Sequence, residues 1–340
     1  MPPIPDSDPP LLQVRDLAVR FHTDGGVVTA VDGLSFSLRR GETLAIVGES
    51  GSGKSVTGLA IMRLLPSGSG CVVEGEVQFA GAGAARNLLL LDPEAMRQIR
   101  GDRIAMVFQE PMTSLNPVHT IGDQIAEPLV HHRGLSHRAA LDRAAELLER
   151  VGIPEPRRRL ASFPHQLSGG MRQRAMIAMA LSCDPDVLIA DEPTTALDVT
   201  IQAQILELIA DLQRQSGMAV IFVTHNLGVV AEIADRVLVM YAGRAMEQAA
   251  VAPLFARPAH PYTTGLLASV PRLDQRGTLR ESLRAIPGNM PDPTRMPPGC
   301  AFHPRCVHAV PGLCDQAVPP AESLADGRVV RCARWRAIAL

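Results

Sequence analysis

The feature that most constrains this chain is the stretch GESGSGKS, Gly48 to Ser55, which follows an apolar run and precedes a helical pattern. The preceding TLAIVG is the near-continuous apolar run of a strand covered on both faces. The residues fit the pattern G-x-x-x-x-G-K-[ST], in which glycines at a strand-to-helix turn let backbone N–H groups approach an anion. The stretch therefore predicts a phosphate-binding loop and an α/β fold around it.

The loop assigns a role to each of its residue types. Lys54 is expected to reach the β- and γ-phosphate oxygens of a nucleotide, and the Ser55 hydroxyl is expected to bind Mg²⁺. A glycine–serine linker can imitate the pattern by chance, but the strand and helix on either side argue against a linker. The remaining residues expected to cradle the phosphates are Gly48, Glu49, Ser50, Gly51, Ser52 and Gly53.

Polar residues also follow two later apolar runs. VLIADE places Asp191 at the carboxyl end of a buried strand, where it suits Mg²⁺ coordination through water, and Glu192 is a candidate general base for an attacking water. His225, at the end of VIFVTH, repeats this placement. From placement alone, a structural histidine is an equally good interpretation of His225.

Strand and helix patterns alternate along much of the chain, which indicates a largely parallel sheet flanked by helices. Residues 121–132 and 136–152 have helical periodicity with charged faces and suggest a helical insertion. After about residue 256 the chain becomes rich in Pro, Gly and Arg, and four of its six cysteines lie there. We expect strands at 11–21, 33–42, 43–48, 73–81, 186–191, 218–225 and 236–243, and helices at 200–215 and 226–234.

Composition excludes several classes of protein. The formal net charge of −2 gives no basic excess for wholesale nucleic-acid binding. No apolar run reaches the 18 or so residues that cross a bilayer. The first ten residues, MPPIPDSDPP, lack the basic and apolar regions of a signal peptide and suggest a flexible tail. Without a secretion signal, the few cysteines favour a reducing cytoplasm.

Six motifs in order give a specific resemblance. GESGSGKS, FQEPMTSLNP, LSGGMRQR, VLIADEP, TTALD and VTH resemble the motifs of the ATPase subunits of ABC transporters, and the resemblance covers residues 11–255. It implies a P-loop NTPase cassette with a RecA-like core, an antiparallel β part and a helical, signature-bearing subdomain at about 110–183. Residues 1–10 then form the tail and 256–340 an irregular C-terminal extension.

The resemblance implies further roles, residue by residue. The signature corner of one cassette covers the γ-phosphate held by the loop of a second cassette, and Met171 stands here where the commonest signature has Gln. Phe21 is placed like the aromatic residue that stacks on adenine, with a core phenylalanine as the alternative. The other implied residues are Ser168, Gly169 and Gly170 of the signature, Gln109 at Mg²⁺ or the attacking water and on the segment that meets the membrane subunits, Asp198 at the dimer seam, and His225 at the γ-phosphate.

The four late cysteines suggest a metal site. Cys300, Cys306, Cys314 and Cys332 are separated by gaps of five, seven and seventeen residues, which do not match the tight pairs of zinc modules. From the residues alone, a metal site and ordinary cysteines both stay open. ARPAHPYTTGLLASVPR and IPG…PPGCAFHPRC resemble the extension of dipeptide and oligopeptide importer ATPases, which implies a [4Fe–4S] cluster, with zinc as the alternative. Cys71 and Cys183 are expected to be buried small apolar residues.

The resemblance implies an ATP- and Mg²⁺-dependent energy-coupling subunit of a dipeptide or oligopeptide importer, bound peripherally at the cytoplasmic face of the inner membrane. Its implied partners are two transmembrane permease subunits, a second ABC ATPase that is a related sibling rather than an identical copy, and indirectly an extracytoplasmic substrate-binding protein. Nickel or another small solute is an alternative cargo. A soluble ABC-type ATPase acting on nucleic acid is a further alternative, disfavoured by the short insertion without heptads. A ribosome-acting ATPase would need two cassettes in one chain.

Overall fold

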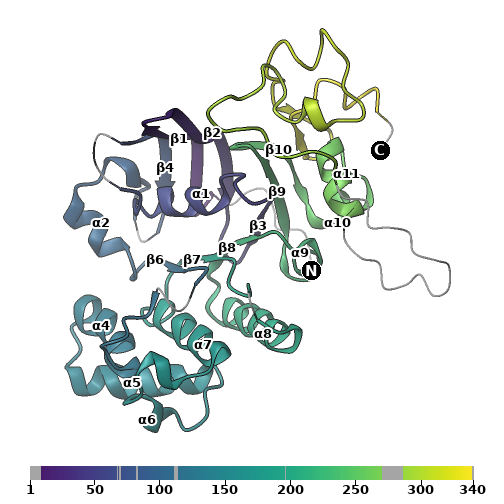
Figure 1. The fold of residues 1–340 in the computed structure, drawn as a ribbon. Helices are drawn as coiled ribbons and strands as arrows, with labels where there is room; N and C mark the ends of the chain where they lie inside the picture. Colours follow the sequence, from purple (N-terminus) through teal and green to yellow (C-terminus); the bar gives the residue numbers. More distant parts are fainter. Residues whose placement is uncertain are drawn as a thin grey trace, which may run out of the picture. The chain divides into compact units, whose positions relative to one another are not determined.

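The structure is a computed structural model that describes residues 9–66, 68, 70–81, 83–110, 114–195, 197–269 and 286–338. Most of the expected N-terminal tail lies outside the described residues. The chain divides into two compact units. Figure 1 labels their helices and strands. The first unit comprises the chain up to Leu12, Leu38–Glu42 and Gln78–Phe222, and the second comprises Gln13–Ser37, Thr43–Val77 and the chain from Val223 onward.

The first unit combines three adjacent strands in the order β8-β7-β6 with a group of helices. The paired strands β6 and β7 are parallel, with Ile104 opposite Val187 and Val107 opposite Ala190. Every residue of both strands is buried, as expected of parallel strands covered on two faces. The elements are β5 (Arg86–Asn87), η1 (Leu88–Leu90), α2 (Pro93–Ile99), β6 (Ile104–Val107), α4 (Ile121–Arg133), α5 (His137–Arg150), α6 (Pro156–Arg159), η2 (Pro164–Gln166), α7 (Gly169–Ala180), β7 (Val187–Asp191), α8 (Val199–Ser216) and most of β8 (Ala219–Thr224).

Helices α4, α5 and α7 pack on one another in the first unit (Figure 1). Each begins at a hydroxyl residue whose side chain accepts a hydrogen bond from the first turn: Thr120 for α4, Ser136 for α5 and Ser168 for α7. Helix α4 ends at Gly134, which has a φ of 65°. Local capping residues therefore mark the starts of these three helices.

The second unit holds the loop predicted to bind phosphate. Its adjacent strands run in the orders β2-β1-β4 and β11-β12-β10-β9-β3, with β3 and β9 parallel and β10 antiparallel to both β9 and β12. The elements are β1 (Leu12–Thr23), β2 (Gly26–Leu38), β3 (Thr43–Val47), α1 (Lys54–Ile61), β4 (Cys71–Phe79), α9 (Leu227–Ile233), β9 (Arg236–Tyr241), β10 (Arg244–Ala250), α10 (Val251–Ala256), α11 (Pro261–Ala268), η3 (His303–Arg305), β11 (Glu322–Ser323) and β12 (Val329–Val330).

The C-terminal extension shares the hydrophobic core of this second unit. Tyr262 of α11 and Phe302 pack against Tyr241 of β9, with ring centroids 4.7 and 5.3 Å from that of Tyr241. Both tyrosines are fully buried. Aromatic rings contribute large buried areas, so these contacts hold the extension to β9.

A buried carboxylate also ties the extension to the sheet. Glu247 of β10 accepts hydrogen bonds from the backbone N–H groups of Ala259 (2.7 Å) and His260 (3.0 Å), just before α11 begins. Burial raises the pKa of Glu247, and the hydrogen bonds that it accepts oppose this rise. The pairing fixes the start of α11, because two successive N–H groups, one of them buried, depend on one side chain.

The expected strands at 11–21, 43–48, 186–191, 218–225 and 236–243 correspond to β1, β3, β7, β8 and β9. The second strand starts earlier than expected, at Gly26, and strands β6 and β10 were not expected from the sequence. Cys183 is buried as expected, but the expectation for Cys71 is wrong: it is only partly buried, because it begins the largely exposed first part of β4. Within the described residues, no helix has both the length and the apolar character to cross a membrane.

Candidate functional site

The predicted phosphate loop, residues 48–55, joins β3 to α1 in a backbone conformation that requires glycine. Gly48 and Gly53 have φ values of 155° and 100°. A Cβ atom at Gly48 would lie 2.2 Å from the Met240 carbonyl oxygen, and one at Gly53 would lie 2.3 Å from that of Ala30. The backbone can therefore follow this path only without side chains at these two positions.

The Lys54 ammonium holds the loop from inside. Its Nζ donates hydrogen bonds to the carbonyl oxygens of Gly48 (2.8 Å) and Glu49 (3.0 Å), and the residue is buried. Ser52 is also buried, and its hydroxyl has no hydrogen-bond partner among the described residues. Ser50 is exposed and Ser55 is half-buried at the start of α1. A buried lysine charge together with an orphaned hydroxyl suits a loop that receives an anion.

Two further candidates lie in the same unit. His225 is exposed and directly follows β8, between Thr224 and Asn226. The side chain of Asn226 caps α9 by accepting hydrogen bonds from Gly228 and Val229, which fixes the backbone beside the histidine. Phe21 is half-buried near the end of β1, a position compatible with both an adenine platform and a core residue.

In the first unit, the acidic pair stands at the end of β7. Asp191 is the buried last residue of the strand, and Glu192 follows with a positive φ of 45°, uncommon for a residue other than glycine. Glu192 Oε2 accepts hydrogen bonds from Gln109 Nε2 (3.2 Å) and Thr195 Oγ1 (2.9 Å). The structure thus brings together the two side chains assigned to the attacking water, and adds Thr195, which the sequence had not singled out.

The signature corner is an exposed helix start. Ser168 caps α7, its Oγ accepting from Met171 N at 3.3 Å, and Ser168 and Gly169 are both exposed. A Cβ atom at Gly169 would meet nothing within 4 Å, whereas one at Gly170 would lie 3.0 Å from Ile201 of α8. Asp198 caps α8 by accepting from Ile201 N at 2.9 Å. Packing explains the glycine at 170 but not the one at 169.

The four late cysteines line one small cavity in the second unit, together with His260, His303 and His308. Burial raises the pKa values of Cys300, to about 11, and of Cys306 and Cys332. Backbone N–H groups donate to two of the sulfurs, Val310 to Cys314 and Arg334 to Cys332. No three His, Cys, Asp or Glu side chains of the described residues stand close enough together to hold a single metal ion.

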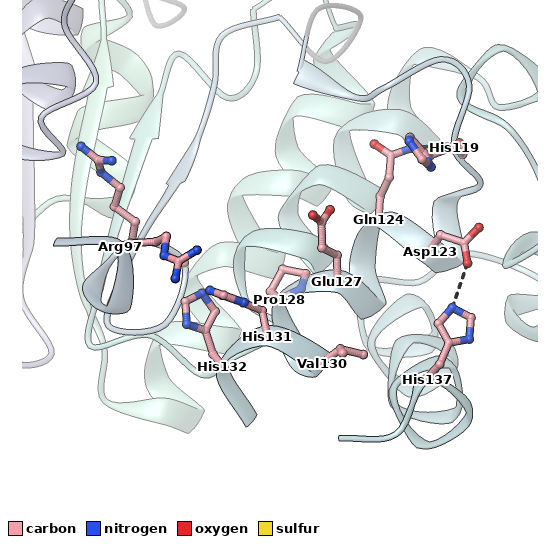
Figure 2. A pocket seen from close by; sticks show the side chains of 12 residues that line it. Arg97, His119, Asp123, Gln124, Glu127, Pro128, Val130, His131, His132 and His137 are labelled. Carbon is pink, nitrogen blue, oxygen red and sulfur yellow. Dashed lines mark hydrogen bonds and ion pairs between the residues drawn. The ribbon is translucent and has the colours of Figure 1, made fainter. Parts of the chain in front are cut away.

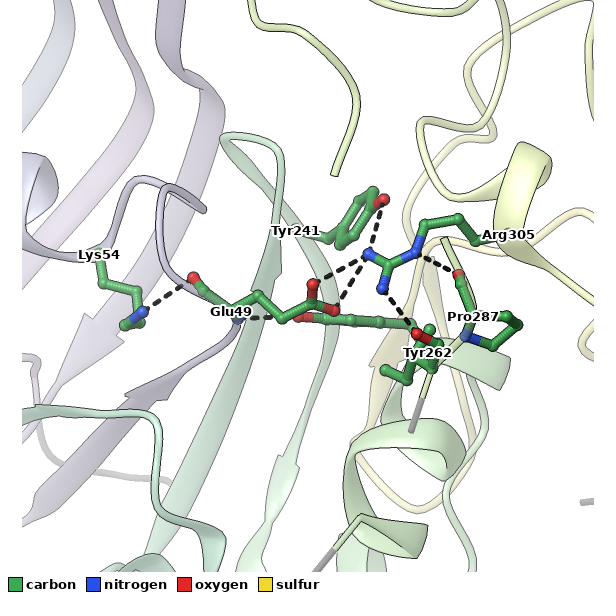
Figure 3. A network of polar contacts seen from close by, with 7 residues as sticks. Glu49, Lys54, Tyr241, Tyr262, Pro287 and Arg305 are labelled. Carbon is green, nitrogen blue, oxygen red and sulfur yellow. Dashed lines mark hydrogen bonds and ion pairs between the residues drawn. The ribbon is translucent and has the colours of Figure 1, made fainter. Parts of the chain in front are cut away.

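A contact that the sequence did not predict links the extension to the phosphate loop. Arg305 Nη1 lies 3.1 and 3.0 Å from the two carboxylate oxygens of Glu49, and Glu49 N donates to the Tyr262 hydroxyl at 2.9 Å (Figure 3). Tyr262 belongs to the stretch ARPAHPYTTGLLASVPR, on which the family resemblance was based. Nothing in that stretch indicated that its hydroxyl would bond Glu49.

The first unit also has an open groove of about 900 Å³ between α2 and α4 (Figure 2). Arg97 lies across the groove from His131 and His132, and Asp123 bonds His137 at 3.2 Å (Figure 2). Burial lowers the pKa of His132, so its imidazole favours the neutral form. Val130 contributes an apolar side chain that is 40% exposed.

Comparison with known proteins decides the family. The ABC transporter family model matches residues 31–195, and the model of the oligopeptide/dipeptide transporter C-terminal region matches residues 246–314. A putative peptide import ATP-binding protein of Brucella melitensis is 57% identical over 334 residues, covering 97% of this chain and 98% of that protein. The chain belongs to the peptide-importer family of ABC transporter ATPases.

Further similarities agree with this membership. The oligopeptide transport ATP-binding protein OppD of Bacillus subtilis is 54% identical over 321 residues, covering 94% of this chain and 88% of that protein. Among solved structures, the dimeric ATP-binding cassette MJ0796 bound to ADP and Pi has a TM-score of 0.62 at 30% identity, covering 71% of this chain and 98% of that one. The predicted cassette fold and its ATPase class are therefore confirmed.

Proposed function

We propose that this ABC ATPase powers an importer of dipeptides or oligopeptides, as the names of its relatives say of those proteins. The observation that carries the nucleotide part is the glycine cradle at Gly48 and Gly53, with the Lys54 ammonium beneath it. ATP binds with its phosphates on this loop, and Phe21 stacks on adenine. In the second unit the Ser55 hydroxyl would hold Mg²⁺, and in the first unit Gln109 and Asp191 carry oxygen atoms of the kind that Mg²⁺ prefers. When bound, the ion would neutralise charge on the transferred phosphoryl group.

The chemistry is attack of water on the γ-phosphate. Glu192 accepts the proton of that water, and Gln109, already bonded to Glu192, orients it. The backbone of Glu192 has a positive φ, and backbone strain of this kind is typical of functional sites. His225 contacts the γ-phosphate at the end of β8.

Glu192→Gln is expected to slow ATP hydrolysis by about 10²–10⁴-fold, because the amide cannot accept the proton. Equilibrium ATP binding stays intact, since the phosphate loop is unchanged. The measurement is phosphate release at saturating ATP by the assembled transporter, alongside nucleotide binding. Hydrolysis at the wild-type rate would remove Glu192 from the role of base.

The signature corner acts on a second nucleotide. Ser168 and Gly169 offer exposed N–H groups at the start of α7, a 12-residue helix whose dipole favours an anion. We propose that this corner covers the γ-phosphate bound by a partner cassette, with Asp198 at the seam. The open space at Gly169 supports this, because the residue has no packing reason to lack a side chain. The partner is a related sibling cassette, as is frequent in this family.

Gly169→Ala separates folding from shared catalysis. The new methyl group meets no atom of the described residues within 4 Å, so thermal stability should not fall. In the assembled transporter the methyl group occupies space for the partner's phosphate, and hydrolysis should fall at least about tenfold, as when a transition-state donor is lost. The control is Glu207→Ala, at an exposed position of α8, which leaves both quantities unchanged. Full hydrolysis by Gly169→Ala would refute the shared site.

The groove in Figure 2 is the proposed contact with the permeases at the cytoplasmic face of the inner membrane. The groove is lined by the apolar side chain of Val130 and by the opposite charges of Arg97 and Glu127. This mixture suits an amphipathic cytoplasmic helix of a permease. The chain also reaches the groove at His119, ten residues after Gln109. A helix seated there can therefore influence the Gln109–Glu192 contact.

Val130→Asp should weaken association with the permease pair by about tenfold or more, since it places an unpaired charge in the groove. ATP binding by the free chain should not change. The matched control is Val27→Asp, in β2 and similarly exposed (46% against 40%). Affinity is measured by titrating each variant onto permeases in nanodiscs, and equal affinities for the two variants would place the permease contact elsewhere.

We propose that the four cysteines lining this cavity hold a [4Fe–4S] cluster. A cluster holds its thiolate ligands farther apart than a single ion does, which agrees with four cysteines lining one cavity without a compact single-ion arrangement among the described residues. The N–H donors to Cys314 and Cys332 are the hydrogen bonds that tune such sulfurs. When bound, the cluster supplies a structural cross-link between these four positions.

Anaerobically purified protein is expected to be brown and to contain iron and acid-labile sulfide in equal amounts. Cys332→Ser should lose most of both, whereas Cys71→Ser, which lies in β4, should keep them. Elemental analysis and absorbance spectra of the full chain provide the measurement. A colourless protein that contains zinc would overturn the cluster.

A further inference from the structure

The phosphate loop carries a carboxylate in an electrostatically awkward place. Glu49 follows Gly48 directly, inside the loop proposed to receive the phosphates of ATP. Like charges at short range disfavour one another, so an uncompensated glutamate here would weaken nucleotide binding. The structure supplies the compensation from the C-terminal extension, through Arg305 (Figure 3).

The ion pair is shielded and geometrically fixed. The Arg305 side chain is 6% exposed and that of Glu49 is 30% exposed. The guanidinium also donates to the carbonyl oxygens of Pro287 (2.9 Å) and Ile286 (3.3 Å) and to the Tyr241 hydroxyl (3.3 Å). All three guanidinium nitrogens thus make hydrogen bonds, which holds the charge in one place, unlike a surface ion pair.

The backbone of Glu49 is held on both sides. Its N–H donates to the buried Tyr262 hydroxyl, and its carbonyl oxygen accepts from Lys54 Nζ at 3.0 Å. The Tyr262 ring packs against Tyr241 and Phe302, so its hydroxyl has little freedom. The extension therefore sets the orientation of a peptide group that the loop lysine also uses.

The segment that carries Arg305 lies between two of the cavity cysteines. Cys300 and Cys306 bracket a compact turn, in which His303 N bonds the Cys300 carbonyl oxygen at 2.9 Å and Cys306 N bonds that of His303 at 3.2 Å. Arg305 is the residue directly before Cys306. A group that binds the sulfurs of Cys300 and Cys306 would therefore also hold the turn between them, and with it the Arg305 side chain.

We propose that Arg305 is a positioning residue for the phosphate loop, acting through Glu49 together with Tyr262, and that the cysteine site sets nucleotide affinity by holding Arg305. This inference rests on the proposed binding of ATP by the loop. It makes the extension part of the nucleotide machinery rather than an independent appendage.

The test is equilibrium ATP binding by the full-length chain. Arg305→Met is expected to weaken ATP affinity about tenfold. It leaves the negative charge of Glu49 without its ion-pair partner in the loop proposed to bind the phosphates of ATP. Adding Glu49→Gln to Arg305→Met should recover most of that loss by removing the charge. A purely structural role for Arg305 predicts no such recovery. The effect should also shrink at high salt, as an electrostatic contribution does.

Two further variants keep the interpretation clear. The control Arg336→Met removes an exposed arginine of the same extension, paired with Glu322, and should bind ATP as the wild type does. Lys54→Ala reports on the proposed function itself, because unchanged ATP affinity in this variant would show that the loop is not the nucleotide site. If Lys54→Ala abolishes binding while Arg305→Met binds normally, only the further inference fails.

The cysteine arm uses Cys306→Ser, with the same binding assay and with hydrogen exchange at the loop as a second readout. ATP affinity should fall and exchange at Glu49 should rise. Arg305→Met added to Cys306→Ser should cause little further loss, because both changes release the same contact. Independent, additive losses, or no loss in Cys306→Ser, would overturn the link between the cysteines and the loop.

Discussion

The close approach of bare backbone at the phosphate loop is the constraint on which the site depends. The loop passes so near the carbonyl oxygens of Met240 and Ala30 that only glycine fits at positions 48 and 53. The start of helix α1 follows this turn directly, and a helix start is where an anion is favoured. Lys54 then closes the loop by bonding two of its own carbonyl oxygens, a pair of contacts that a phosphate can replace.

The same region explains why the extension is built into the second unit. A glutamate in an anion-binding loop needs a counter-charge, and the fold provides it from 256 residues further along the chain. Tyr241, Tyr262 and Phe302 form the apolar platform that carries this arginine. The aromatic contacts, the Glu49–Arg305 ion pair and the cysteine cavity thus lie next to one another around one core. Because protein cores are close-packed, a change in one of them is expected to shift the others.

In the first unit, the residues proposed to act on ATP lie where regular structure ends. Glu192 adopts a positive φ immediately after β7, and Ser168 and Asp198 stand at the starts of α7 and α8. Strand ends and helix starts leave polar groups that the element itself does not satisfy, so ligands can use them. At the exposed Gly169, a Cβ atom would meet no atom within 4 Å in the part of the chain that the structure describes, which is why we propose that a partner's nucleotide requires the glycine.

By itself, the sequence determined the elements with strong local signals: the buried runs of β3, β7, β8 and β9, the helices α4, α5 and α8, and the motifs that mark the ATPase family. It did not reveal β10, whose RAMEQAA lacks the β-branched residues of a strand and is held by pairing with β9 and β12. Only the tertiary structure gathered the four cysteines around one cavity and set Arg305 against Glu49. Such contacts join residues far apart in the chain, and local spacing carries no information about which distant charges or sulfurs will meet once the core has packed.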